Sequence, residues 1–149
     1  MASQVETLSF VARRLIQYER KFSQAPLDRR KAVSGLFNGI TQSVNSLAED
    51  LSRARLPHES CRKLVLHSTR LAELSEEELG HSEAERLATS LRSACDQEKL
   101  YLEYTSSERR EYLSEELRKA AILIQALADG IYIEPKDGES DGSGLAAPA

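Results

Sequence analysis

Long hydrophobic segments are missing from this sequence of 149 residues. Its longest uninterrupted apolar run covers residues 120–124, whereas a helix that crosses a bilayer needs about 20 apolar residues in succession. The first part of the chain carries charged side chains without a central apolar block, so no secretory signal is expected. These two absences predict a protein of the cytoplasm with no membrane span.

Tryptophan is absent, and aromatic residues make up only 5% of the chain. The hydrophobic content of 40% therefore comes mainly from Leu, Ala, Ile and Val, a composition typical of packed helices rather than of an aromatic-rich β-sandwich. Only seven Gly and four Pro occur, and five of these eleven residues lie in 134–149. The body of the chain has few helix breakers, which predicts an all-α fold.

Residue types that bind metals and perform catalysis are also scarce. There are two cysteines, Cys61 and Cys95, without a CxxC motif, and three histidines. We expect both cysteines to be buried free thiols. Glu78 and His81 have the Glu-x-x-His spacing of di-iron bundles, but one copy is too few for such a site. Glycine-rich phosphate loops and recognisable nucleophile triads are lacking, so no metal and no cofactor are expected.

The most apolar stretch covers residues 112–133. Its apolar residues alternate at spacings of four and three, which places them on one stripe of a helix; they are Leu113, Leu117, Ala120, Ile124, Leu127 and Ile131. Such a stripe must be covered by other helices. A second stripe with heptad spacing covers Val33, Phe37, Ile40, Val44, Leu47, Leu51 and Ala54.

The remaining boundaries follow from helix breakers and capping residues. We predict helices over 3–23 and 26–55, and a third that starts near Pro57. We expect a short helical turn after Ser75, an interruption of the helix at Gly80, and the start of a new helix at Ser82. The capping-box spacing of Ser75/Glu78 and Ser82/Glu85 supports the two helix starts. Ser106 or Ser107 caps the next helix, unless 82–129 is one long rod.

The expected architecture is an antiparallel bundle of four or five helices over residues 1–133, followed by a disordered acidic Gly/Pro-rich tail over 134–149. Gly35 and Gly39 lie four residues apart on the second predicted helix. They indicate either the close approach of a neighbouring helix or a local weakness.

Charge is divided unevenly between the halves of the chain. Residues 1–63 hold eleven Lys or Arg and six Asp or Glu, a balance of +5, whereas 64–149 hold nine and eighteen, a balance of -9. One interpretation is that helices of opposite charge lie against each other. The other is a basic surface that binds an anionic partner.

A basic cluster would form if the first two predicted helices made a hairpin about Pro26. It is our candidate partner-binding site and consists of Arg13, Arg14, Arg20, Lys21, Arg29, Arg30 and Lys31. RNA, lipid headgroups and acidic protein segments are all chemically suitable ligands. An acidic protein surface is favoured over nucleic acid, because the net charge is -4 and aromatic stacking platforms are few.

Three tyrosines, Tyr101, Tyr104 and Tyr112, flank the least certain helix boundary. Large aromatic side chains there either close one end of the core or form a subunit interface.

Arg62 and His67 fit a spacing, Arg followed after four to six residues by His, that resembles HEPN-type ribonucleases. The resemblance implies a metal-independent site, in which one His and one Arg from each subunit of a dimer act on the scissile phosphate.

The leading hypothesis is a non-catalytic helical bundle that acts as an adaptor, scaffold or chaperone-like protein. Its partner is an acidic protein surface or a second copy of the chain in a homodimer. A ribonuclease built on Arg62 and His67 is the enzymatic alternative, and anion binding at the basic cluster is the third.

Overall fold

The computed structural model describes residues 4–96, 100 and 106–132, and within these ranges the chain forms helices and no strand. The expected all-α bundle is therefore confirmed. No helix in the described residues is long and apolar enough to cross a membrane. The elements are α1 (Gln4–Ile16), α2 (Glu19–Ser23), α3 (Leu27–Ser52), α4 (His58–Leu74), α5 (Glu76–Leu79), α6 (His81–Ser93) and α8 (Ser107–Tyr132).

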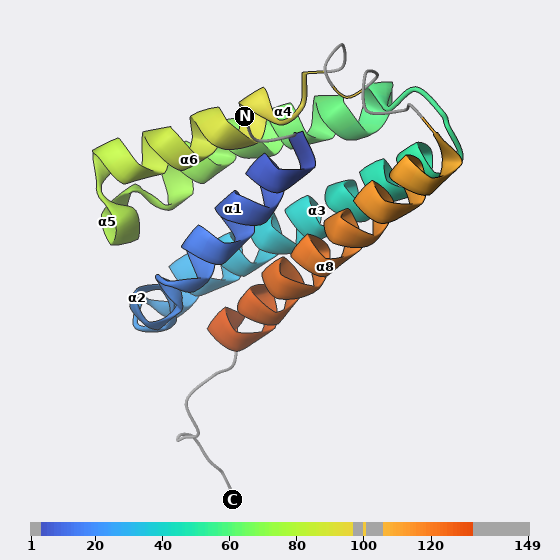
Figure 1. Ribbon diagram of the computed structural model, residues 1–149. Helices are drawn as coiled ribbons and strands as arrows, with labels where there is room; N and C mark the ends of the chain where they lie inside the picture. Colours follow the sequence, from blue (N-terminus) through green and yellow to red (C-terminus); the bar gives the residue numbers. More distant parts are fainter. Residues whose placement is uncertain (1–3, 97–99, 101–105, 133–149) are drawn as a thin grey trace, which may run out of the picture.

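α3 and α8 lie side by side and have the most extensive packing of any helix pair (Figure 1). Near one end, the Ser34 hydroxyl donates a hydrogen bond to the Ala128 carbonyl at 2.9 Å. Near the other end, the Ser114 hydroxyl donates to the Ala48 carbonyl at 3.1 Å. Ser34, near the start of α3, thus bonds a residue near the end of α8, whereas Ala48, near the end of α3, bonds a residue near the start of α8. The two helices are therefore antiparallel.

The two predicted apolar stripes are buried in the core. All six stripe residues on α8 are buried, and so are the stripe residues of α3 from Val33 to Leu51. Ala54, predicted as the end of the α3 stripe, is exposed beyond the helix end and has a φ of 54°. Burying one large aliphatic side chain stabilises the fold by roughly 1.5–3 kcal/mol, so the core around this helix pair contributes a large part of the hydrophobic stabilisation.

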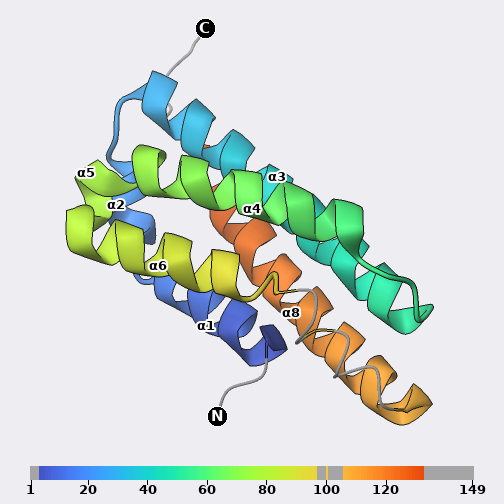
Figure 2. The same ribbon diagram turned by 90° about the horizontal axis from the view of Figure 1, so that it is seen from above.

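The other long helices complete a closed ring of which α3 and α8 are two members. α1 packs against α8, α4 packs against α3, α4 also packs against α6, and α6 meets α1 (Figure 2). The short helix α2 places Phe22 in the core, where its ring meets the edge of Phe37 with centroids 5.5 Å apart.

The first predicted helix, over 3–23, is divided in two. α1 ends at Ile16, and α2 begins at Glu19 after a tightened turn in which the Gln17 and Tyr18 amides bond the carbonyls three residues earlier. No Gly or Pro marks this break. As a result of the break between α1 and α2, the Phe22 side chain lies in the core, whereas the Tyr18 side chain faces α6.

The predicted break at Gly80 is confirmed. Gly80 has a φ of 86°, a conformation that favours glycine. The predicted capping boxes are wrong, however. The Ser75 hydroxyl donates to the Leu71 carbonyl instead of capping α5, and α6 starts at His81 with Gly80 as its N-cap residue, which leaves Ser82 inside the helix.

One long rod over 82–129 is also excluded. α6 ends at Ser93, and a separate helix, α8, starts at Ser107. The predicted cap by Ser106 is confirmed, since its hydroxyl accepts a hydrogen bond from the Arg109 amide at 3.1 Å. The predicted tail over 134–149 lies outside the described residues.

Candidate interaction groove between α3 and α4

The helix hairpin on which the predicted basic cluster was based does not form. α1 packs against α8 and α6 instead of forming a hairpin with α3. Three cluster residues have partners within the chain: Arg14 pairs with Glu83, Arg29 pairs with Glu78 at 2.6 Å, and Arg30 is buried. Arg14 and Arg29 therefore join helices to each other, whereas the Arg30 guanidinium donates a hydrogen bond to the Ala25 carbonyl at 2.9 Å, just before its own helix.

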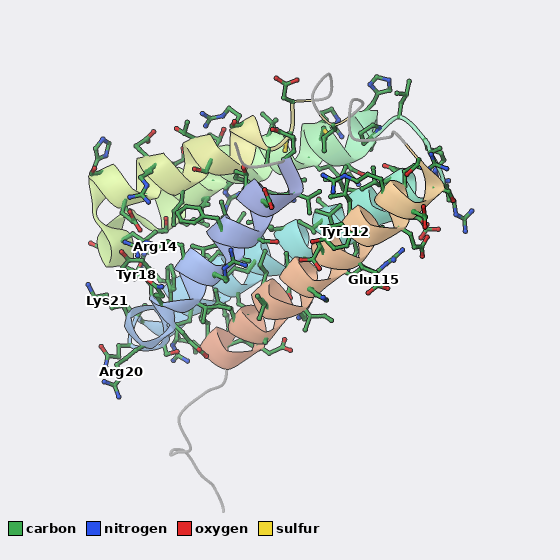
Figure 3. The ribbon with its side chains drawn as sticks, viewed as in Figure 1. Arg14, Tyr18, Arg20, Lys21, Tyr112 and Glu115 are labelled. Carbon is green, nitrogen blue, oxygen red and sulfur yellow. The ribbon has the colours of Figure 1, made fainter. Side chains whose placement is uncertain are left out.

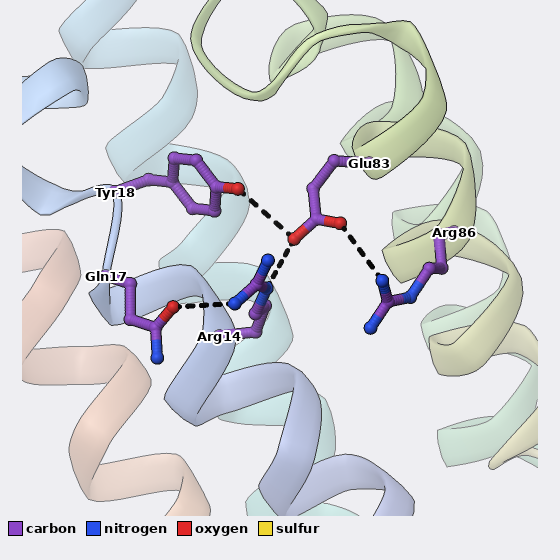
Figure 4. A network of polar contacts seen from close by, with 5 residues as sticks. All are labelled: Arg14, Gln17, Tyr18, Glu83 and Arg86. Carbon is purple, nitrogen blue, oxygen red and sulfur yellow. Dashed lines mark hydrogen bonds and ion pairs between the residues drawn. The ribbon is translucent and has the colours of Figure 1, made fainter.

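Glu83 on α6 is the centre of a polar network that joins α6 to α1 (Figure 4). Its Oε2 accepts hydrogen bonds from Arg14 Nε at 2.5 Å and from the Tyr18 hydroxyl at 3.3 Å, while Arg86 lies 3.6 Å from its Oε1. The hydrogen bond from Arg14 is the main cause that lowers the pKa of Glu83. This contact supports the interpretation that helices of opposite charge pack together.

Four other cations of the predicted cluster are exposed: Arg13, Arg20, Lys21 and Lys31. Arg20 and Lys21 extend outward from the α2 end of the bundle (Figure 3). The Lys21 ammonium lies 5.9 Å from the centre of the Tyr18 ring, a separation at which cations interact with aromatic faces.

Of the three tyrosines expected either to close one end of the core or to form a subunit interface, only Tyr112 lies in the described residues. It lies on α8 and is 56% exposed, and the Arg109 guanidinium is 5.9 Å from its ring centre. Tyr112 and Arg13 line one shallow groove between α1 and α8. Tyr101 and Tyr104 lie outside the described residues.

A larger groove lies between α3 and α4 and has a volume of about 430 Å³. α4 contributes two cations, one histidine and one leucine, while α3 contributes small and polar residues. The lining residues are Gly39, Gln42, Ser43, Ser46, Arg62, Lys63, Leu66 and His67. None of these eight residues is acidic, and Arg62 and Lys63 place positive charge at the groove.

Contacts at both ends of this groove hold α3 and α4 in position. At one end, the Ser60 hydroxyl donates to Asp50 at 3.0 Å, and Arg55 pairs with the same carboxylate at 3.2 Å. At the other end, His67 lies against Gly39, where an added Cβ would be 2.8 Å from the imidazole Cε1. The close approach predicted for the glycine pair is therefore found at Gly39, whereas Gly35 has open space around it.

The His67 imidazole is held in its neutral form. Burial is the main cause that lowers its pKa, and the positive charges of Arg70 and Lys63 add to the effect. A hydrogen-bonding contact with the Gly39 backbone acts in the opposite direction. These contacts account for His67 as a residue that packs two helices together.

The cations on the α4 rim are exposed. Arg62 pairs with Glu59 one turn earlier at 2.5 Å, which raises the pKa of Arg62 and lowers that of Glu59. Lys63 and Arg70 are both exposed on the same helix. Leu66 lies between them and is 56% exposed. An exposed leucine surrounded by cations is the most distinctive feature of this face.

Leu66 and Lys63 belong to no motif that marks them as functional residues in the sequence. The buried stripe of α4 includes Cys61, Leu64, Ser68 and Leu71, and Leu66 lies off that stripe. An apolar residue off the buried face of an amphipathic helix was therefore the one indication present in the sequence.

The residues weighed as metal ligands have other partners. Glu78 pairs with Arg29, and His81 Nδ1 lies 2.8 Å from Glu76 Oε2. Within the described residues, no three His, Cys, Asp or Glu side chains are grouped in a way that could hold a metal ion. Arg62 and His67, the pair with HEPN-like spacing, do line the same groove.

Comparisons with protein-family models, with curated proteins and with solved structures found no match for this chain.

Proposed function

We propose that this chain is a non-catalytic helical bundle of the cytoplasm, and that its groove between α3 and α4 binds an acidic, amphipathic segment of a partner protein. The observation that carries this proposal is the exposure of Leu66 between the cations of α4. The cytoplasmic location rests on the two free cysteines, since disulfides are rare in reducing compartments.

The chemistry of the groove defines the ligand. An apolar side chain of the partner would cover Leu66, and carboxylates around it would face Lys63, Arg62 and Arg70. Buried apolar anchors supply most of the binding energy in interfaces, whereas charges at the rim mainly select the partner and speed association. The hydroxyl and amide groups of Ser43, Ser46 and Gln42 would offer hydrogen bonds on the α3 side.

The affinity is expected to be modest. Covering one exposed leucine contributes roughly 1.5–3 kcal/mol, and exposed charge pairs contribute less than about 1 kcal/mol each. These contributions total at most about 6 kcal/mol, so a dissociation constant of roughly tens of micromolar to millimolar is expected.

A pair of synthetic helical peptides tests the proposal. Both carry the same leucines on one face, but one has glutamates and the other lysines on its polar face. Fluorescence anisotropy should detect binding of the acidic peptide and not of the basic one. Leu66→Asn and Lys63→Glu should each weaken binding of the acidic peptide by at least about tenfold.

Lys31→Glu is the matched control, because it makes the same charge change at an exposed position of α3 outside the groove. Binding that is lost with Lys31→Glu and retained with Lys63→Glu would move the site to the predicted basic cluster. If Leu66→Asn, Lys63→Glu and Lys31→Glu all left binding of the acidic peptide unchanged, the groove between α3 and α4 would not be the binding site.

The enzymatic alternative is retained because Arg62 and His67 line one groove. Single-stranded RNA incubated with the purified chain and a metal chelator tests it directly. Cleavage that is abolished by His67→Ala and by Arg62→Ala would establish a ribonuclease. Cleavage that survives both changes would come from a contaminant.

Self-association is a further part of the proposal, and it is supported by a different face. On α8, Ile122 is 67% exposed and Leu123 is 36% exposed. Adjacent exposed aliphatic side chains on one helix are suited to a two-fold interface with a second copy of the chain.

A further inference from the structure

The two cysteines come from different helices and meet in the fold. Cys61 lies in the first turn of α4, and Cys95 lies just after the end of α6. Because α4, α5 and α6 form a hairpin, the start of α4 lies near the end of α6. Both thiols are free and buried, and both line one hollow between the two helices.

The two sulfurs are not equivalent. The contact between the two thiols is the main cause that lowers the pKa of the Cys61 thiol, against the effects of burial and of the Asp50 and Asp96 charges. The same contact and burial raise the pKa of Cys95, whose sulfur also lies 3.3 Å from the Leu91 carbonyl. Cys61 also lies in the first turn of α4, where the positive end of the helix dipole favours a thiolate. It is therefore the sulfur suited to attack, because the thiolate is the reactive form.

Both cysteines line a hollow of about 350 Å³ together with Arg62, Val65 and Leu66. Cys61 is 2% exposed and Cys95 is 6% exposed, so the hollow is the route by which a reagent as small as a peroxide would reach the sulfurs. Arg62 also provides a cation beside this hollow.

We propose that Cys61 and Cys95 are a reversible thiol–disulfide pair that reacts with hydrogen peroxide. The Cys61 thiolate attacks one peroxide oxygen, the O–O bond breaks, and the departing hydroxide takes up a proton to leave as water. Cys61 is then a sulfenic acid. The Cys95 sulfur attacks the Cys61 sulfur, the S–O bond breaks, and a second water leaves. Two thiols and one peroxide thus give one disulfide and two waters, and a dithiol reductant reverses the change.

The disulfide would join the start of α4 to the end of α6 and so close the open end of this hairpin. A cross-link of this kind reduces the freedom of the unfolded chain, so oxidation should raise the melting temperature. A transient disulfide of this type is compatible with a reducing compartment, where such bonds serve redox sensing. The inference does not depend on the proposed partner groove.

Peptide mapping under non-reducing conditions tests the pair in the full-length chain. Trypsin releases Cys61 in LPHESCR (56–62) and Cys95 in SACDQEK (93–99). After peroxide treatment, the monomeric protein should lose two hydrogens in mass, and these two peptides should be recovered joined. A dithiol should restore both the mass and the original melting temperature.

Single variants separate the roles of the two sulfurs. Cys95→Ser should stop at a sulfenic acid on Cys61, which dimedone labels, and Cys61→Ser should react at least about tenfold more slowly. Neither variant should show a rise in melting temperature with peroxide. Circular dichroism spectra of both variants would serve as the control for folding.

The same treatment in urea provides the decisive comparison. If the fold positions the thiols, the native chain forms the bridge faster than the unfolded chain. Equal rates would overturn the proposal, and so would disulfides that form only between chains. Two thiols that stay reduced in the native chain while reacting in urea would overturn it as well.

Discussion

The imidazole of His67 on α4 occupies the space that a side chain at Gly39 on α3 would need. An added Cβ at Gly39 would lie 2.8 Å from His67 Cε1 and 3.1 Å from Nε2, closer than packed carbon atoms approach each other. Gly35, one turn earlier on the same helix, has nothing within 4 Å of its added Cβ. The space around Gly39 thus leaves no room for a side chain, whereas the space around Gly35 does.

Alanine at these two positions should have different effects on stability. Gly35→Ala should raise the free energy of unfolding by roughly 0.5–1 kcal/mol, because alanine favours the helix. The free energy of unfolding of Gly39→Ala should be at least about 1 kcal/mol lower than that of Gly35→Ala, since the His67 side chain must move to make room for the added methyl group. Urea unfolding monitored by circular dichroism measures both. Adding His67→Ala to Gly39→Ala should restore part of the gain, and no restoration would contradict the steric explanation.

The carboxylate of Glu83 should contribute to stability by joining α6 to α1. Glu83→Gln should lower the free energy of unfolding by about 1–2 kcal/mol near neutral pH, because Arg14 and Tyr18 lose a charged acceptor. Glu85→Gln is the control, since Glu85 is exposed on the same helix and the change should cost less than about 0.5 kcal/mol.

The contribution of Glu83 should also depend on pH. Its pKa in the folded chain lies below the ordinary value of 4.5. A carboxylate with a depressed pKa stabilises the fold fully above its unfolded pKa, and this contribution is lost as the pH falls through the folded pKa. The stability difference between the wild type and Glu83→Gln should therefore shrink between about pH 6 and about pH 3. A difference that stays constant with pH would mean that the charge of Glu83 is not what stabilises the contact.

Two isoleucines of α8 should differ sharply in their effect on stability. Ile124 is 1% exposed, whereas Ile122, two positions earlier, is 67% exposed. Ile124→Ala should lower the free energy of unfolding by about 2–5 kcal/mol, because it leaves a cavity in the core. Ile122→Ala should stay within about 0.5 kcal/mol of the wild type in dilute solution. Equal losses would contradict the orientation of α8.

The exposed face of α8 should control self-association. If the chain forms a dimer through Ile122 and Leu123, light scattering should give twice the chain mass, and Ile122→Glu should return the mass to that of one chain, because it buries a charge in the interface. The helical circular dichroism spectrum should not change, since Ile122 lies outside the core. A dimer that survives Ile122→Glu would place the interface elsewhere.

The positions of the main helices could be predicted because helix periodicity is a local property. The repeat of apolar residues that includes Leu117 and Ile124 identifies the buried face of α8 without reference to any other element. Gly80 likewise marks an interruption of the helix by itself, because glycine adopts backbone conformations that are unfavourable for residues with a side chain. The break after Ile16 could not be predicted, since no breaker marks it and the packing of Phe22 against Phe37 depends on a distant helix.

The candidate sites depended on contacts between distant segments. The sequence placed Arg14 and Arg29 in one basic cluster, but the neighbours of α1 are α8 and α6, and these two charges pair with acids on other helices. Charge pattern alone does not state which helix a cation faces, because that is decided by how the apolar stripes are covered.

By itself, this sequence determined an all-α chain, the buried faces of its two longest helices and the break at Gly80. Each of these follows from local propensity and periodicity within one turn or one stripe. Only the tertiary structure decided that Cys61 meets Cys95, that His67 rests on Gly39, and that Leu66 stays exposed beside a cationic groove. Those pairings depend on the order in which helices pack around the core, which no local pattern encodes.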